Sequence, residues 1–332
     1  MSKTKPNRHD HYVPECYLNS FTIPDGKGGI MFWKWRTQYR SIGKSCPSQV
    51  CYENYFYDLD QSVMSRYGTT NPSLIEQHAF KDFEDNIQAI VAEFATKPAT
   101  IPIPVFLLIC RGYILQKLRT PTYIKGVKEV DKISGLEMRM KAFESFRKEL
   151  KKDDPRLDRF RSDPNFDYYF TDDYWDNLRK DVPHIPFDAK TTQQQSIIEA
   201  LSGISETANH ALFRLAQMRV VVINAPEGEY FLASDNPGFS ILRHPNEPIF
   251  LTHSFRLNDM IAAFYPISSN QALMFQMIQE PPSDERDRHL NYYSASPEDM
   301  YVYNQDTLKN SDQYVFCCDR EYLRRFIERV AT

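Results

Sequence analysis

Four residues of types that perform acid–base or metal chemistry are spread along the chain: His11, Glu76, Glu84 and Asp235. Histidine transfers protons near neutral pH, and convergent carboxylates hold divalent metals or orient a water molecule. We therefore expect His11 to act as an acid or base. Glu76, Glu84 and Asp235 are the expected catalytic carboxylates and metal ligands, with a divalent metal as cofactor. The alternative is that the two glutamates pair with arginines inside a helical bundle and only hold its register.

A second group of residues is suited to binding an anion. On a helix, Gln116 and Arg119 lie within about 60° of Gly112, so they share one stripe. A guanidinium binds phosphate or carboxylate through paired hydrogen bonds. Asn236 lies in the turn 234–237, directly after a predicted strand, where functional side chains are often presented. We predict that Gln116, Arg119 and Asn236 bind substrate, although this turn could equally be an Asx-type turn that closes a strand.

The helix that carries this stripe is predicted between Pro102 and Pro121. Its apolar residues point in every direction, which is typical of a helix surrounded by protein. Buried arginines need partners, and this helix carries both Arg111 and Arg119. A preceding helix, predicted from Asn71 to about Ala95, offers its two glutamates. The two helices should therefore lie side by side.

The remaining patterns predict an α+β fold, with helices in the middle and a mostly antiparallel, β-rich C-terminal third. Within one domain spanning 1–332 we expect four sub-regions. They are an N-terminal motif with a β-hairpin (9–70), a core helix pair (71–121), a charged helical projection with a lid-like connection (122–190), and a helix followed by the β-rich part (191–332). In this last part we expect a helix over 191–218, strands at 219–224, 230–234, 239–242, 249–253, 261–266, 272–278 and 314–318, and a closing helix over 321–330.

Composition limits the classes of function. A net charge of -4 and a pI near 6.1 argue against a globally basic nucleic-acid binder. Six cysteines form no CxxC pair and no zinc-like quartet, which is typical of free thiols in a reducing, cytoplasmic setting. The N-terminal residues do not resemble a signal peptide. The apolar run 101–110 is too short to span a bilayer, which takes roughly 20 residues, so we expect no membrane association.

Several common catalytic motifs do not occur in the sequence. It contains no Gly-x-Ser-x-Gly elbow, no Walker-type phosphate loop and no Rossmann fingerprint. No Asp…(Asp/Glu)-x-Lys triplet follows Asp235, so the common nuclease core is not evident. Any chemistry must therefore come from the dispersed polar residues described above.

Those dispersed residues occur in motifs that together resemble one protein family. The motifs are His11-Tyr12-Val13-Pro14 with Leu18 and Phe21, Asn54-Tyr55-Phe56-Tyr57, Gln116-x-x-Arg119-Thr120-Pro121 and Ser234-Asp235-Asn236-Pro237. In this combination the chain resembles the mainly bacterial family called domain of unknown function 4238. The resemblance implies a single cytoplasmic module and supplies no activity. Polar residues in four separate segments favour one shared pocket over four independent struts.

From these patterns we predict a hydrolase that acts on a phosphodiester, either a nucleic acid or a nucleotide. A role in bacterial stress or phage defence would suit such a stand-alone protein. One alternative is a non-catalytic module that binds an anionic ligand or a partner protein. The other is a buried polar network with a purely structural role.

Overall fold

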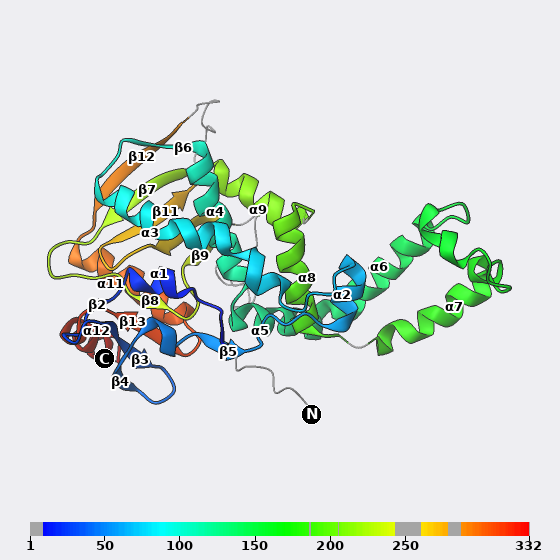
Figure 1. Ribbon diagram of the computed structural model, residues 1–332, viewed down its shortest axis with the longest axis horizontal. Helices are drawn as coiled ribbons and strands as arrows, with labels where there is room; N and C mark the ends of the chain where they lie inside the picture. The colour runs from blue at the N-terminus through cyan, green and yellow to red at the C-terminus, as the bar shows by residue number, and fades with distance from the viewer. Residues whose placement is uncertain (1–8, 186, 205, 243–259, 278–286, 332) are drawn as a thin grey trace.

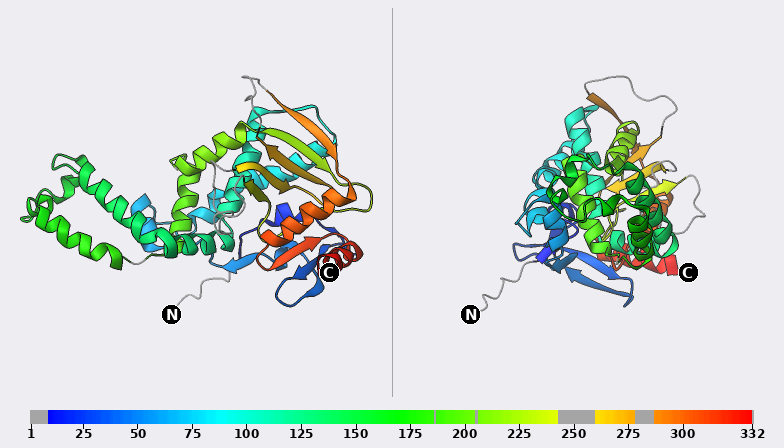
Figure 2. Two further views of the ribbon diagram at one scale, coloured as in Figure 1. Left: turned by 180° about the vertical axis from the view of Figure 1, so that it is seen from behind. Right: turned by 90° about the vertical axis from the view of Figure 1, so that its right-hand side faces the viewer.

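Two β-sheets and a layer of helices hold the polar motifs. The computed structural model describes residues 9–185, 187–204, 206–242, 260–277 and 287–331. Figure 1 shows the sheets and their helices in one body, from which the helices α6 (Leu136–Glu149) and α7 (Asp172–Asp181) project as an arm. Figure 2 shows the same arm from behind. The predicted α+β class is confirmed.

The larger sheet has six strands in the order β6-β12-β7-β11-β10-β9. All neighbours are antiparallel except β12 and β7, which are parallel. The strands are β6 (Thr100–Pro102), β12 (Asp287–Ser294), β7 (Arg219–Asn224), β11 (Gln271–Gln276), β10 (Met260–Pro266) and β9 (Phe239–Leu242). The mostly antiparallel arrangement of the C-terminal third is therefore confirmed.

A second sheet joins the N-terminal hairpin to the end of the chain. Its order is β2-β3-β13-β8, and β4 pairs with the free side of β3 within the hairpin. The strands are β2 (Ile23–Pro24), β3 (Ile30–Arg36), β4 (Ser41–Ser45), β13 (Tyr314–Cys317) and β8 (Ala233–Ser234). Two short strands, β1 (His9–His11) and β5 (Tyr52–Asn54), form a separate pair.

The central helix α4 runs from Ile103 to Leu118, as its sequence predicts. Pro102 occupies the N-cap position, and Pro121 begins the next helix, α5 (Pro121–Val130). A proline restricts the residue before it to an extended backbone, and Thr120 has φ −85° and ψ 152°. The chain therefore cannot continue α4 into α5 without a bend.

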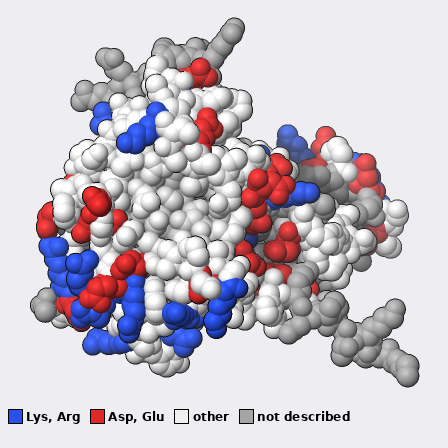
Figure 3. All heavy atoms as spheres, turned by 60° about the vertical axis from the view of Figure 1, so that its left-hand side comes forward, with Lys and Arg blue, Asp and Glu red and all other residues white. Residues whose placement is uncertain are grey.

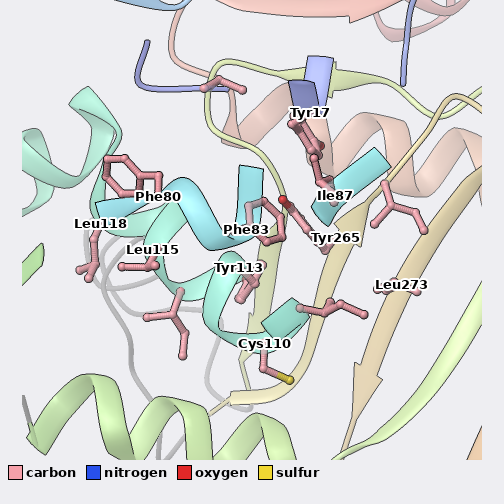
Figure 4. Packing of buried hydrophobic residues seen from close by; sticks show 14 of the residues in the cluster. Tyr17, Phe80, Phe83, Ile87, Cys110, Tyr113, Leu115, Leu118, Tyr265 and Leu273 are labelled. Atoms are coloured by element: carbon pink, nitrogen blue, oxygen red, sulfur yellow. The ribbon is translucent and has the colours of Figure 1, made fainter. Parts of the chain in front are cut away.

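Helix α4 is covered by α3 (Lys81–Ala95), α8 (Ala189–Ser202) and α9 (Glu206–Ala216). In Figure 4, Phe83 lies beside Tyr113 of α4, and Phe80 lies near Leu115 and Leu118 at the end of that helix. Gly112 allows this close approach, because a Cβ atom there would lie 2.1 Å from the ring of Phe83. Gly112 thus serves packing between two helices.

Four predicted elements differ from the structure. The helix from Asn71 begins instead with a π-helical turn, η2 (Ile75–Ala79), before α3. The helix predicted over 191–218 is divided into α8 and α9, because Gly203 adopts a left-handed conformation (φ 71°) that ends α8. The charged helix is interrupted by a π-helical segment at Asp131–Gly135, and the expected lid-like connection contains the regular helix α7.

The strand predicted at 230–234 is reduced to β8. The amide of Asn304 accepts a bond from Leu232 N and donates one to Tyr230 O, so a side chain takes the place of a neighbouring strand. The polar strand β12 was not predicted, since only Leu290 in it is buried. The strand predicted at 249–253 lies outside the described residues. Within the described residues, no helix is both long and apolar enough to cross a membrane.

Candidate functional site

Arg119 lies at the centre of a buried polar network at the end of α4. Arg119 is 2% exposed to solvent. The guanidinium donates to Glu84 Oε1 (2.8 Å) and to the Tyr57 hydroxyl (3.2 Å), and a third bond goes to the backbone carbonyl of His11. Its carbon Cζ lies 3.6 Å from the ring centroid of Phe80, in a cation–π contact. Arg119 is therefore engaged on every side.

The electrostatics of this network favour a permanently charged guanidinium. Burial alone would lower the pKa of Arg119, but Tyr57 and Glu84 outweigh it and raise that pKa. Burial raises the pKa of the Tyr57 hydroxyl, and Glu76 and Glu84 add to the rise while Arg119 opposes it. Both predicted glutamates therefore lie close enough to Tyr57 to act on it.

The network anchors the N-terminal motif to α4. Gln116 donates to the backbone carbonyl of Tyr12 (2.9 Å), one residue after the carbonyl that Arg119 binds. Tyr57 donates through its backbone N–H to the carboxylate of Asp10 (3.0 Å). Gln116 of α4 and Arg119, the C-cap residue of that helix, thus bind two successive backbone carbonyls, those of the last residue of β1 and of the residue after it. The structure brings Glu84, Gln116 and Arg119 together with the N-terminal strand, and the contact to His11 is through its backbone carbonyl.

The His11 imidazole is half-buried and lies beside a different carboxylate, that of Glu15. Its Nε2 lies 3.5 Å from Glu15 Oε1, and its side chain is 15% exposed. Burial lowers the pKa of His11, Arg119 lowers it further, and Glu15 opposes them. A neutral imidazole near pH 7 follows, in a form able to accept a proton.

Asp235 occupies a different environment, in the turn after β8. Its carboxylate accepts three backbone N–H bonds, from Asp312 (2.8 Å), Gln313 (2.6 Å) and Tyr314 (3.1 Å). Burial raises its pKa to about 7, against the opposing effect of these donors. Within the described residues, neither a hydrogen bond nor an ion pair joins Asp235 to Arg119. Asp235 therefore fixes the loop before β13 rather than completing the predicted site.

Lys117 is a buried polar residue that the sequence did not single out. It is 8% exposed and donates to Asn236 Oδ1 (3.2 Å) and to the backbone carbonyl of Gly238. Burial lowers its pKa to about 7. Asn236 in turn donates to the carbonyl of Asn310 (2.8 Å). The predicted substrate ligand Asn236 thus joins α4 to the last residue of α11 (Pro297–Asn310).

The predicted metal ligands Glu76, Glu84 and Asp235 do not form one coordination group. No set of three or more His, Cys, Asp or Glu side chains in the described part of the chain is arranged to hold a metal ion. The physical reason is that Glu84 is turned to Arg119 and Asp235 to backbone N–H groups. Their geometry gives no support to a metal site.

A cavity of about 450 Å³ lies on the other side of the same helices. Its polar lining consists of Asp82, Arg111 and Ser202, all of them exposed, so the cavity opens to solvent. Its remaining lining is Gly112 and seven apolar side chains: Leu74, Ile75, Phe83, Leu108, Leu115, Ile198 and Leu201. Ligand sites in proteins usually have such volumes and such mostly apolar walls.

Arg111 is the cation of this cavity. One of its guanidinium nitrogens donates to the carbonyl of Leu201 (2.7 Å), which fixes its direction. In the described residues it has no carboxylate within ion-pair distance, although Asp82 also lines the cavity. The sequence suggested Arg111 as a possible ion-pair partner for Glu76 or Glu84. In the structure the ion pair of Glu84 is with Arg119.

The network and the cavity use neighbouring residues of the same elements. On α3, Phe83 lines the cavity while Glu84 binds Arg119. On α4, Leu115 lines the cavity while Gln116 binds the N-terminal strand. The cavity wall also includes Ile75 of η2, and π-helical turns occur frequently at functional sites. The polar network therefore holds in place the helices that form the cavity.

Comparisons with known proteins assign the chain to a family. A family model described as protein of unknown function (DUF4238) matches residues 9–321, which is nearly the whole chain. A search of curated proteins found no match, and neither did a search of solved structures. The match contains all four motifs on which the resemblance was based. The chain belongs to the DUF4238 family.

Proposed function

We propose that this protein is a non-catalytic binding module for a small anionic ligand, held in the cavity between α3, α4 and α8. The single observation that carries the proposal is the open, apolar cavity of about 450 Å³ with the Arg111 guanidinium in its wall. Seven apolar side chains supply the driving force for binding an apolar body. Arg111 supplies a charge-assisted bond for an anionic head group.

The charges of the lining narrow the ligand class to apolar monocarboxylates. Asp82 lines the same cavity and would repel a second negative charge on the ligand. A phosphate monoester, which carries close to two charges at neutral pH, is therefore a poorer fit than a carboxylate. Since Arg111 is held by Leu201, its remaining donors are oriented before the ligand arrives.

Titration calorimetry with decanoate, decanol and decyl phosphate tests this proposal. Decanoate should bind the wild type best. Arg111→Gln should weaken decanoate about tenfold, the loss of one charge-assisted bond at a partly solvated site, and leave decanol unchanged. Asp82→Asn should improve decyl phosphate more than decanoate. If Arg111→Gln binds decanoate as tightly as the wild type, the proposal is wrong.

The phosphodiester hydrolase stays a prediction from the sequence. What supports it is that Glu84 and Arg119 are in contact and that the half-buried imidazole of His11 is close enough to Arg119 for that charge to lower its pKa. What weighs against it is that the polar groups of Arg119 already have partners within the protein. A nucleic-acid, nucleotide or protein partner, a divalent metal, a cytoplasmic location and a bacterial phage-defence setting are likewise predictions. If His11→Ala hydrolysed every tested phosphodiester as fast as the wild type, the hydrolase prediction with His11 as acid or base would be wrong.

A further inference from the structure

A basic surface lies on the β3–β4 hairpin and the C-terminal helix α12 (Arg320–Ala331). We call it the hairpin–α12 surface, defined as residues 25–45 and 319–331. Residues 25–45 carry five Lys/Arg and one Asp, and residues 319–331 carry four Arg and three Asp/Glu. The whole chain, by contrast, has a net charge of -4. Figure 3 shows Lys and Arg side chains gathered along the lower edge of this side of the molecule, with acidic side chains among them.

Several of these cations are available to an external anion. Arg36, Arg40 and Lys44 are exposed, and no carboxylate of the described residues lies within ion-pair distance of them. Arg324 on α12 differs, because Glu321 and Glu328 both hold it. Arg320 and Arg325 of α12 are exposed and have no carboxylate of the described residues within ion-pair distance, so cations without an ion pair lie on both the hairpin and α12. Phosphate groups of a polyanion are its natural complement.

Aromatic side chains lie among these cations. Tyr39, in the turn between β3 and β4, is 67% exposed, and the Arg36 guanidinium lies 5.9 Å from its ring centroid. On the opposite face of the hairpin from Arg36, Trp33 has Lys44 at 5.2 Å and Arg320 at 5.4 Å from its ring. An exposed aromatic ring beside guanidinium groups is the arrangement on which unpaired bases stack.

We propose that the hairpin–α12 surface binds single-stranded nucleic acid without sequence preference. A strand that passes around the edge of the hairpin contacts Arg36 and Arg40 through its phosphates on one side and Lys44 on the other, and a base stacks on Tyr39. This inference concerns a surface separate from the α3–α4–α8 cavity and does not depend on the ligand proposed there. The exposed ring distinguishes an unstacked strand from other polyanions, since a base offers a flat face to it.

Fluorescence anisotropy of the full-length protein with labelled oligothymidylate and oligouridylate tests the proposal. The variant Arg36→Gln/Arg40→Gln/Lys44→Gln should bind at least about tenfold more weakly. The slope of log K against log salt concentration should become shallower by roughly 2, because each of the three lost phosphate contacts contributes about 0.7 on a single strand. Tyr39→Ala should lose at least about fivefold with an unchanged salt slope, while Tyr39→Phe retains binding.

A matched control removes the same charge elsewhere. Lys141, Lys148 and Lys151 lie on the exposed arm, and changing all three to Gln should leave binding unchanged. Circular dichroism melts of all variants should match the wild type, because every changed side chain is exposed. The proposal is overturned if the hairpin variant binds like the wild type or if the arm variant loses as much. It is also overturned if the protein binds phosphatidylserine vesicles but neither oligonucleotide.

Discussion

Replacing Arg119 by methionine tests whether the polar network is a structural element. Methionine keeps much of the side-chain volume but removes the bonds to Glu84, to Tyr57 and to the His11 carbonyl. The contact of the guanidinium with Phe80 is lost as well. Arg119→Met should therefore release the N-terminal strand from the end of α4.

The expected loss in the free energy of unfolding follows from these contacts. Breaking a buried ion pair typically costs ~3–5 kcal/mol, because the partner charge stays behind. The Glu84 side chain is 35% exposed, so water can solvate it once Arg119 is gone. This keeps the loss in the lower part of the range, at about 3–4 kcal/mol. Arg119→Lys should fall between the wild type and Arg119→Met, since one ammonium group cannot reach all three acceptors.

Urea unfolding followed by circular dichroism measures these differences. Arg161→Met is the matched control, because Arg161 pairs with Asp158 at the surface of the arm. Surface pairs contribute little, so the control should lose less than about 1 kcal/mol. If Arg119→Met were as stable as Arg161→Met, the network would not be structural. A role of Arg119 in binding or catalysis would then be the better explanation of its charge and its burial.

Three further predictions concern other buried groups. Tyr57→Phe should destabilise the protein by about 1–2 kcal/mol, because the hydroxyl donates to Arg119 O and accepts from its guanidinium. Tyr265→Phe should be neutral or stabilising, since no partner of that buried hydroxyl lies in the described residues, and urea midpoints compare the two variants. Asp235→Asn places an amide against three N–H donors and should cost about 2–4 kcal/mol in the same assay, against no change for the exposed Asp153→Asn. Burial lowers the pKa of Lys117 from 10.5 to about 7. Between these pH values the unfolded chain binds more protons at this residue than the folded one, so the free energy of unfolding rises with pH. The rise of about 2 kcal/mol from pH 7 to 9 should be absent in Lys117→Met.

Much of the fold was predictable from local patterns in the sequence. The apolar residues on all sides of α4, bounded by Pro102 and Pro121, predicted a buried helix of nearly the observed length. The short apolar runs 219–224 and 261–266, rich in residues that favour strands, predicted β7 and β10. The strand predicted at 230–234 is shorter in the structure, where residues 230–232 are not part of it. The sequence could not show this, because the side chain of Asn304, distant in sequence, binds the backbone of Tyr230 and Leu232.

The candidate site was predictable only in part. The contact between Glu84 and Arg119 follows from two facing helices with complementary charges, and it was one of the two alternatives that the sequence offered. Lys117 was missed, although one signal was present: it lies on a helix predicted to be buried all round. The cavity has no signal in the sequence, because Leu108, Leu115 and Ile198 would look the same in a filled core. Such a gap depends on how α3, α4 and α8 meet.

The most direct test of the proposed function is to locate a bound carboxylate by NMR. In methyl-labelled protein saturated with decanoate, intermolecular NOEs should connect the ligand methylenes to the methyl groups of Ile75, Leu115 and Ile198, which line the cavity. Leu273 and Leu323, in the core away from the lining, should show none. Contacts to the three cavity methyl groups are the predicted result, and Arg111→Gln should need about tenfold more decanoate to give them. NOEs elsewhere, or none at saturating decanoate, would contradict the assignment of this cavity as the binding site.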